Sequence, residues 1–174
     1  MSLAIRLANP VELEVLPVIE IKAATLISDN DLPPHLKNTP TSIESFQLAC
    51  SESRLWVAEK DSTVVGFLLA SFHNPYFHID EIDVDPEYGR QGIGREMMTV
   101  VLTQAKDLGY EQASLTTFVH IPWNAPFYQS LGFSTRSKSI PEFLIDRLKF
   151  EDSLGLKNRV AMTRILWRHL GFTL

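Results

Sequence analysis

The sequence predicts an α/β fold in one domain that spans residues 1–174. Two patterns support this prediction: short segments rich in β-branched and aromatic residues, and one long stretch, Ile93 to Leu108, with apolar residues at helical spacing. Hydrophobic residues make up 45% of the chain and charged residues 21%, which is typical of globular proteins. A chain of 174 residues can bury about 70% of its unfolded surface. We therefore expect a substantial core that needs no disulfide or metal to fold.

The N-terminal segment predicts a strand and two helices with a loop between them. Leu3–Leu7 has the pattern of a short strand, and an apolar helical stretch runs from Pro10 to about Leu26. Residues 28–40 contain three prolines, two asparagines and two aspartates, which favour a loop beside the substrate. The second helix is expected to begin at Thr41 or Ser42 and to end before Arg54.

A hairpin and a fourth strand follow. Arg54–Glu59 and Thr63–Phe72 are dominated by β-branched and aromatic residues, and residues 60–62 between them have turn chemistry. His78–Val84 alternates polar and apolar residues until Pro86 stops the ladder, so this strand is expected to be irregular.

The C-terminal half predicts two helices and three strands. Gly109 can close the long helix in a left-handed cap. The segments that follow are, in order, a strand at Ala113–Val119, a short helix at Asn124–Leu131, a strand at Phe133–Arg136, a tail over residues 137–158 and a strand at Arg159–Leu166. No repeat, linker or second domain is visible.

Charge and cysteine content exclude several classes of function. The net charge of −5 opposes non-specific binding to nucleic acid or anionic lipid. Cys50 is the single cysteine, which excludes an internal disulfide and any multi-cysteine metal site. No signal peptide or run of 18 apolar residues is visible. We expect a cytoplasmic protein with no metal, no nucleic-acid partner and no membrane contact.

A glycine-rich turn lies between the fourth strand and the long helix, from Pro86 to Arg95. Gly89, Gly92 and Gly94 allow unusual φ angles and close approach of the backbone, while Arg90 and Arg95 add positive charge. Free amides at a helix N-terminus attract an anion, and a pyrophosphate fits such a turn. A tight turn with a helix cap is an equally good interpretation of this pattern alone.

Two other nucleotide motifs do not fit the glycine-rich turn. A P-loop requires Lys followed by Ser or Thr after the last glycine, but Arg95 and Glu96 stand there. The dinucleotide fingerprint follows a first strand, whereas this turn lies in mid-chain after a hairpin. ATP and NAD are therefore poor candidates.

Two motifs resemble the GNAT family of N-acetyltransferases. Ile82-Asp83-Val84-Asp85-Pro86, followed by Arg90-Gln91-Gly92-Ile93-Gly94-Arg95, resembles its acetyl-CoA signature, although Gly89 replaces the usual Gln or Arg. Residues 122–133, which end in Leu131-Gly132-Phe133, resemble its later motif. The resemblance implies a mixed, mostly antiparallel, twisted sheet of six to seven strands with helices on both faces. It also implies acetyl-CoA as co-substrate.

The resemblance also assigns cofactor-binding residues. Backbone groups of Ile82, Asp83 and Val84 are expected to contact the pantetheine arm and the acetyl carbonyl, with the Val84 N–H at the oxyanion. Amides of Arg90, Gln91, Gly92, Ile93, Gly94 and Arg95 are expected to hold the pyrophosphate. Asn124 is also a cofactor-binding candidate, but the family's asparagine aligns with Ile121, and capping the short helix is an alternative role for Asn124.

Acetyl transfer to an amine also needs a base and an acid. An amine of pKa about 10.4 is almost fully protonated at pH 7, and Glu81 is the first candidate for the base. Asp80, Asp83, His78 and His120 are alternatives, and each of these acids can equally belong to a solvated strand face. Tyr128 is the candidate acid for the thiolate, or else a core aromatic residue. Cys50 is more typical of apolar packing, which favours direct transfer over a ping-pong route.

The expected function is transfer of an acetyl group from acetyl-CoA to a primary amine of a small molecule or peptide. A CoA-binding module without transfer activity and an acyltransferase for another acyl-CoA are the alternatives. The acceptor site is expected between residues 28–40, the fourth strand and residues 137–158. Three aromatic residues have alternative expected roles: they line the acceptor site, they belong to the core, or they form the interface of a homodimer. These residues are Trp123, Phe127 and Phe143.

Overall fold

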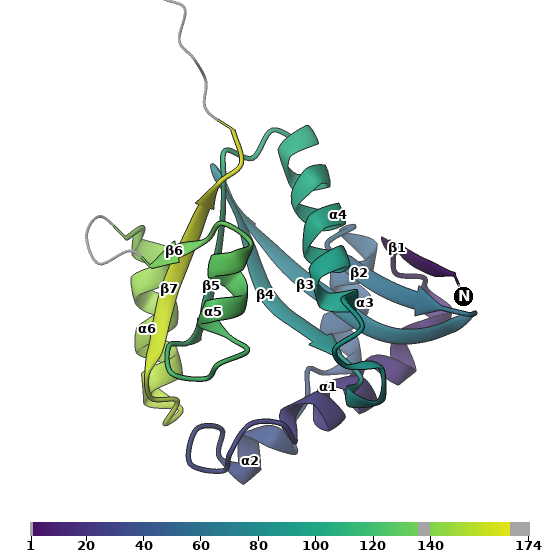
Figure 1. Ribbon diagram of the computed structural model, residues 1–174, viewed down its shortest axis with the longest axis horizontal. Helices are drawn as coiled ribbons and strands as arrows, with labels where there is room; N and C mark the ends of the chain where they lie inside the picture. The colour runs from purple at the N-terminus through teal and green to yellow at the C-terminus, as the bar shows by residue number, and fades with distance from the viewer. Residues whose placement is uncertain (1, 136–139, 168–174) are drawn as a thin grey trace, which may run out of the picture.

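Seven strands form one mixed sheet in the computed structural model, which describes residues 2–135 and 140–167 (Figure 1). Their order across the sheet is β1-β2-β3-β4-β5-β7-β6. Their bounds are β1 Leu3–Leu7, β2 Leu55–Lys60, β3 Thr63–His73, β4 Tyr76–Val84, β5 Gln112–Phe118, β6 Ser134–Thr135 and β7 Arg159–Ile165. The predicted fold class and number of strands are confirmed, while Arg136, the last residue of the predicted sixth strand, lies outside the described residues.

All neighbouring strands pair antiparallel except β4 and β5. A parallel pair needs a long crossover connection, and α4 (Ile93–Asp107) supplies it. Gly109 has φ +93°, so the left-handed cap predicted after this helix is confirmed. The crossover places the glycine-rich turn at the end of β4, next to β5.

Helices cover both faces of the sheet. On one face, α4 and α5 (Ala125–Ser130) pack over the main core, which includes Leu68, Phe77 and Met97. On the other face, the 3-10 helix η1 (Pro10–Val15), α1 (Leu16–Ala24) and α3 (Ile43–Ser51) pack over Phe67. The same face carries α6 (Glu142–Ser153) farther along the sheet, where Glu151 accepts a hydrogen bond from Thr116 of β5.

Three helical segments differ from the prediction. The first helix is split into η1 and α1, and the expected loop contains a one-turn helix, α2 (Pro34–Lys37). The whole of α6 was missed, because its apolar residues do not form one stripe: Leu144 is buried, whereas Ile145 and Phe150 are exposed. The predicted tail is therefore a helix over most of its described length. Ser42 caps α3 as expected, since its hydroxyl accepts from the Ser45 amide at 3.2 Å.

A β-bulge at Asp80 makes β4 irregular, as the sequence predicted. Ile79 pairs with Ala70 and Glu81 with Leu69, so Asp80 is one extra residue on β4. Ile79 points toward the core beneath α4, and Leu69 packs on the opposite cluster. The side chains of Asp80 and Glu81 consequently both point to the face covered by α1 and α6.

None of the helices in the described part of the chain is long and apolar enough to span a membrane. Within residues 2–135 and 140–167 no group of three His, Cys, Asp or Glu side chains is arranged to hold a metal ion.

Candidate active site

β4 and β5 separate beyond their ladder, and a cleft lies beside the end of β4. Their ladder pairs Tyr76–Ile79 with Gln112–Leu115, but β4 continues to Val84 and β5 to Phe118 (Figure 1). The cleft has a volume of about 640 Å³. The end of β4 and the glycine-rich turn form one wall, α5 and the segment before it form another, and the end of α1 closes a side. This opening is large enough for an extended ligand.

The end of β4 presents backbone groups to the cleft. The Asp85 amide donates to the Val65 carbonyl of β3 at 2.8 Å. In an antiparallel pair the direction of the backbone groups alternates, so the N–H and C=O groups of Val84 and Ile82 point away from β3. The β5 ladder has already ended at this point. Polar backbone groups of Ile82 and Val84 are therefore free to bind a ligand in the cleft.

The glycine-rich turn has left-handed backbone at two positions, Arg90 with φ +58° and Gly92 with φ +81°. Gly89 instead has φ −60°, and Gly94 lies inside α4 with no positive φ, so only one of the three glycines has the unusual angle expected of them. Gly92 is the N-cap of α4 and has no side chain to occupy the free amides of the first turn. The amides of the first turn are therefore unpaired, and Gly94, one of their residues, lines the cleft.

The side chains of the turn have different surroundings. Arg90 lines the cleft. Gln91 accepts a hydrogen bond from Lys60, and Arg95 donates to Ser130 at 2.7 Å while lying 5.8 Å from the ring centre of Phe127. Ile93 is buried in the core, so only its backbone can meet a ligand. The positive charge of Lys60 near this turn was not anticipated from the sequence.

Two carboxyl groups lie together at the end of β4. Glu81 and Asp83 share one face of the sheet and are hydrogen-bonded to each other, which requires a proton on one of them. Burial, the nearby Glu20 and Asp80 raise the pKa of Glu81 to about 7, against the opposing charges of Arg159 and Arg147. Burial and the charge of Glu81 raise the pKa of Asp83 well above its usual value.

Glu20 and Arg159 are the charged neighbours that sequence reasoning missed. Glu20 lies on α1 and accepts hydrogen bonds from the Thr41 amide at 3.0 and 3.1 Å. Arg159 begins β7 and donates to Glu151 at 2.9 Å. Both act on Glu81 through space. No motif marks them, because they come from distant elements and meet β4 only in the folded chain.

Tyr128 faces the same region from α5 and lines the cleft. Burial and the charges of Glu81 and Asp83 raise the pKa of its phenol, so the hydroxyl stays protonated at neutral pH. Tyr128 also packs against Phe127 and Phe133. The structure therefore brings Tyr128 and Glu81, which are 47 positions apart in the sequence, to one site.

The remaining candidates differ in their position relative to the cleft. Asn124 occupies the N-cap position of α5, but its side chain makes no capping hydrogen bond, so the predicted capping role is wrong and the residue lines the cleft instead. His78 is buried and hydrogen-bonded to Ser114 at 2.9 Å, and burial with nearby Arg147 lowers its pKa to about 3. His120 pairs with Asp31. Neither histidine is among the residues that line the cleft.

Comparison with known proteins identifies similar chains. Residues 24–133 match the acetyltransferase (GNAT) family. The uncharacterised N-acetyltransferase YafP of Escherichia coli K12 is 26% identical over 136 residues, which cover 77% of this chain and 83% of YafP. Human N-acetyltransferase 8 is 32% identical over 93 residues, which are 50% of this chain and 41% of the human protein, so less than half of that protein is matched.

Solved structures share the fold. The PaiA N-acetyltransferase of Thermoplasma acidophilum, in complex with coenzyme A, superposes with a TM-score of 0.72 at 18% identity over 95% of this chain and 99% of that chain. The ribosomal-protein-S18-alanine N-acetyltransferase of Escherichia coli superposes with a TM-score of 0.73 at 18% identity, over 99% of this chain and 99% of that chain. At this identity the likeness establishes the fold alone. Because the family match covers more than half of the residues, the chain belongs to the GNAT family of acetyltransferases.

Proposed function

We propose that the protein transfers the acetyl group of acetyl-CoA to a primary amine of a small molecule or peptide by direct attack. One observation carries the proposal: the free backbone edge of β4, the N-terminus of α4, Asp83 and Tyr128 line one cleft, and Glu81 lies close enough to Asp83 and Tyr128 for its charge to raise the pKa of both. Family membership supports the acyltransferase chemistry.

The residues at the cleft suit acetyl-CoA, which supplies an activated thioester when bound. The free backbone groups of Ile82 and Val84 would hold the pantetheine arm, which carries amides that pair with a free strand edge, whereas the backbone of Asp83 points toward β3. The amides of residues 90–95 (Arg90, Gln91, Gly92, Ile93, Gly94 and Arg95) would hold the pyrophosphate at the positive end of α4. The Arg90 and Asn124 side chains line the same cleft and would add polar contacts.

Glu81 fits the role of general base. A base works best when its pKa lies near the operating pH, and the pKa of Glu81 is about 7. Burial and the charge of Glu81 also raise the pKa of Asp83, because two carboxylates this close disfavour both being charged at once. His78 already has Ser114 as partner and lies in the wall of a separate cavity, so it is less suited to this role.

Tyr128 fits the role of general acid. Its phenol keeps its proton at neutral pH and lies at the cleft. The departing thiolate has a conjugate acid of pKa about 8.5, so it can accept a proton from the phenol or, at higher pH, leave without one. Cys50 is not among the cleft residues, and its thiol lies 3.3 Å from the Ala8 carbonyl, which supports direct transfer without a cysteinyl intermediate.

The test combines titration calorimetry with acetyl-CoA and a thiol-release assay over a panel of amines, amino acids and peptides. The proposal predicts acetyl-CoA binding in the wild type and in Glu81→Gln, with amine-dependent thiol release that is rapid in the wild type and strongly reduced in the variant. Acetyl-CoA binding without release for any amine would identify a CoA-binding module instead. Faster release from propionyl- or succinyl-CoA would identify a different acyl donor, and no binding of any acyl-CoA would overturn the proposal.

A further inference from the structure

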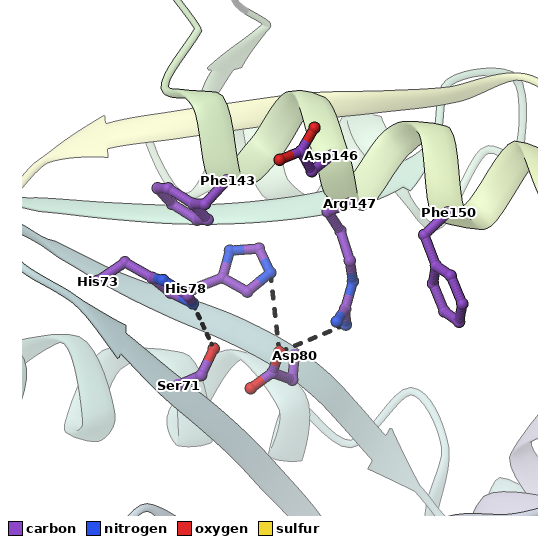
Figure 2. A pocket seen from close by; sticks show the side chains of 8 residues that line it. All are labelled: Ser71, His73, His78, Asp80, Phe143, Asp146, Arg147 and Phe150. Carbon is purple, nitrogen blue, oxygen red and sulfur yellow. Dashed lines mark hydrogen bonds and ion pairs between the residues drawn. The ribbon is translucent and has the colours of Figure 1, made fainter.

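A second cavity, of about 280 Å³, lies between α6 and the strands β3 and β4 (Figure 2). It shares no lining residue with the acetyl-CoA cleft. Half of its wall belongs to α6, which lies beyond residues 24–133, the part of the chain that matches the family. This cavity is therefore a feature that the family match does not describe.

Aromatic rings form much of the cavity wall. The rings of Phe143 and His73 stack with centres 4.2 Å apart and planes within 5°. The rings of His78 and Phe143 are nearly perpendicular, with their centres 5.6 Å apart. Phe150 extends from α6 beside Arg147 and is 58% exposed, and within the described part of the chain no aromatic ring packs against it (Figure 2). Such a wall offers ring faces and edges to a flat apolar group.

The charges around the cavity balance. Arg147 reaches down from α6 to Asp80 at 3.3 Å (Figure 2). It also lies 3.4 Å from Glu151. Glu151 is itself paired with Arg159, and Asp146 with Lys149 at 3.3 Å. His78 is neutral because burial lowers its pKa. Net charge in the cavity therefore favours neither a carboxylate nor an ammonium group of a ligand. The guanidinium of Arg147, by contrast, can stack on an aromatic ring of a ligand.

The cavity adjoins the proposed base. Asp80 lines the cavity, and the bulge turns Asp80 and Glu81 to the same face of the sheet. Arg147 is close enough to Glu81 to lower its pKa. Consecutive Cα atoms are about 3.8 Å apart, so the wall of the cavity begins one residue from the proposed base.

We propose that this cavity is the specificity subsite for the acceptor and that it takes an aromatic ring joined to the primary amine by a short aliphatic chain. The inference rests on the proposed function, since the amine must reach Glu81. It names the acceptor class as arylalkylamines. The volume accommodates one or two fused rings, and the α6 side chains that enclose it select the ring.

The first test compares kcat/KM for 2-phenylethylamine with that for butylamine, 1,4-diaminobutane and 4-aminobutanoate. A single methylene in a well-filled apolar pocket is worth about 10- to 200-fold, so 2-phenylethylamine should exceed the other three by at least about tenfold. Preference for the diamine would assign the cavity to an ammonium group, and preference for the amino acid would assign it to a carboxylate. Either result, or equal rates, overturns the inference while leaving the acetyl transfer intact.

The second test uses two exposed positions on α6. Phe150→Ala removes a wall of the cavity, whereas Ile145→Ala removes a side chain that is 40% exposed and does not line it. Phe150→Ala should lower kcat/KM for 2-phenylethylamine about fivefold or more and leave that for butylamine unchanged, and Ile145→Ala should change neither. A loss with both amines, or with both variants, would contradict a ring subsite.

A binding measurement separates this inference from the proposed function. NMR of the imidazole signals of His73 and His78 during titration with 2-phenylethylamine needs no turnover. Shifts of these signals in a protein that transfers no acetyl group would support the subsite and refute the transferase. Turnover of 2-phenylethylamine without shifts of these signals would support the transferase and refute the subsite.

Discussion

The Nε2 atom of His120 lies 2.8 Å from Oδ1 of Asp31 and joins two segments that are 89 residues apart. Asp31 follows α1 in the chain, and Leu26 and Ile27, which lie between α1 and Asp31, line one side of the cleft. His120 precedes Trp123 and Asn124, which line another side. Ser28 donates to the second oxygen of Asp31 at 2.7 Å and fixes its orientation. The pair therefore ties together two walls of the proposed active site.

Breaking this pair should loosen the cleft without stopping the chemistry. We expect His120→Ala and Asp31→Asn to raise KM for acetyl-CoA or the amine about two- to fivefold, as for the loss of one exposed hydrogen bond, with kcat changed less. Steady-state kinetics of both variants beside the wild type checks this. Asp29→Ala is the matched control, since Asp29 pairs with Lys37 and does not reach across the cleft. A tenfold fall in kcat for His120→Ala alone would instead indicate a direct catalytic role.

The pH dependence of activity should report Glu81. A base acts in its ionised form, and the pKa of Glu81 is about 7, so kcat/KM should rise with pH below about 7 and level off above it. Glu81→Gln should lower kcat/KM about 10²- to 10⁴-fold and remove this rise. A rise that persists unchanged in Glu81→Gln would assign the ionisation to another group, such as Asp83.

Stability supplies a second measurement on Glu81. Its pKa is raised on folding from the usual 4.5, so the folded state holds the proton more tightly than the unfolded state. The contribution of Glu81 to the free energy of unfolding is therefore fully present below about pH 4.5 and is lost as the pH rises toward 7. Glu81→Gln should match wild type in urea unfolding at low pH and be more stable at pH 8. Equal stability at both values would show that the pKa is not raised.

Glu20 should tune this base without touching substrate. Its charge raises the pKa of Glu81, so Glu20→Gln should move the midpoint of the kcat/KM profile to lower pH. The glutamine oxygen can still accept from the Thr41 amide, which keeps α1 tied to the start of α3. The full pH profile is the measurement, because a merely structural role would lower activity at every pH and leave the midpoint in place.

Local patterns in the sequence predicted the strands and the glycine-rich turn, because each depends on nearby residues, and the family resemblance pointed to Tyr128. Residues that meet only through tertiary packing could not be predicted. Glu20 lies on α1 and Arg159 on β7, and nothing in their local patterns indicates that both act on Glu81. The helix α6 was missed for a related reason: its face toward the second cavity carries Phe143 and Arg147, so apolar and charged residues share one side.

Tyr128→Phe should slow the reaction in a pH-dependent way. The variant keeps the ring contacts with Phe127 and Phe133 and loses only the proton donor. We expect kcat to fall about 10- to 100-fold at pH 7, with KM for acetyl-CoA little changed. The deficit should shrink above the thiol pKa of about 8.5, where the thiolate leaves without a proton. A deficit that is constant across pH would indicate that the phenol positions substrate instead of donating a proton.

Two glycines of the cofactor turn should respond differently to alanine. Gly92 has φ +81° and no atom within 4 Å of an added Cβ, so Gly92→Ala strains only the backbone. That strain costs about 1–2 kcal/mol, or roughly 2–8 °C in Tm. Gly94 has no positive φ, and its Cβ would lie 3.9 Å from Phe127 and Val84, so Gly94→Ala should keep the wild-type Tm.

Acetyl-CoA binding completes the comparison of the two variants. Gly94 lines the cleft, so the added methyl group of Gly94→Ala enters the space proposed for the cofactor, and its Kd should rise although the fold is intact. Calorimetric titration and thermal unfolding on the same samples measure both effects. Because Gly92→Ala moves the first amides of α4, its Kd should rise together with the fall in Tm. Unchanged affinity in both variants would place the pyrophosphate somewhere other than this turn.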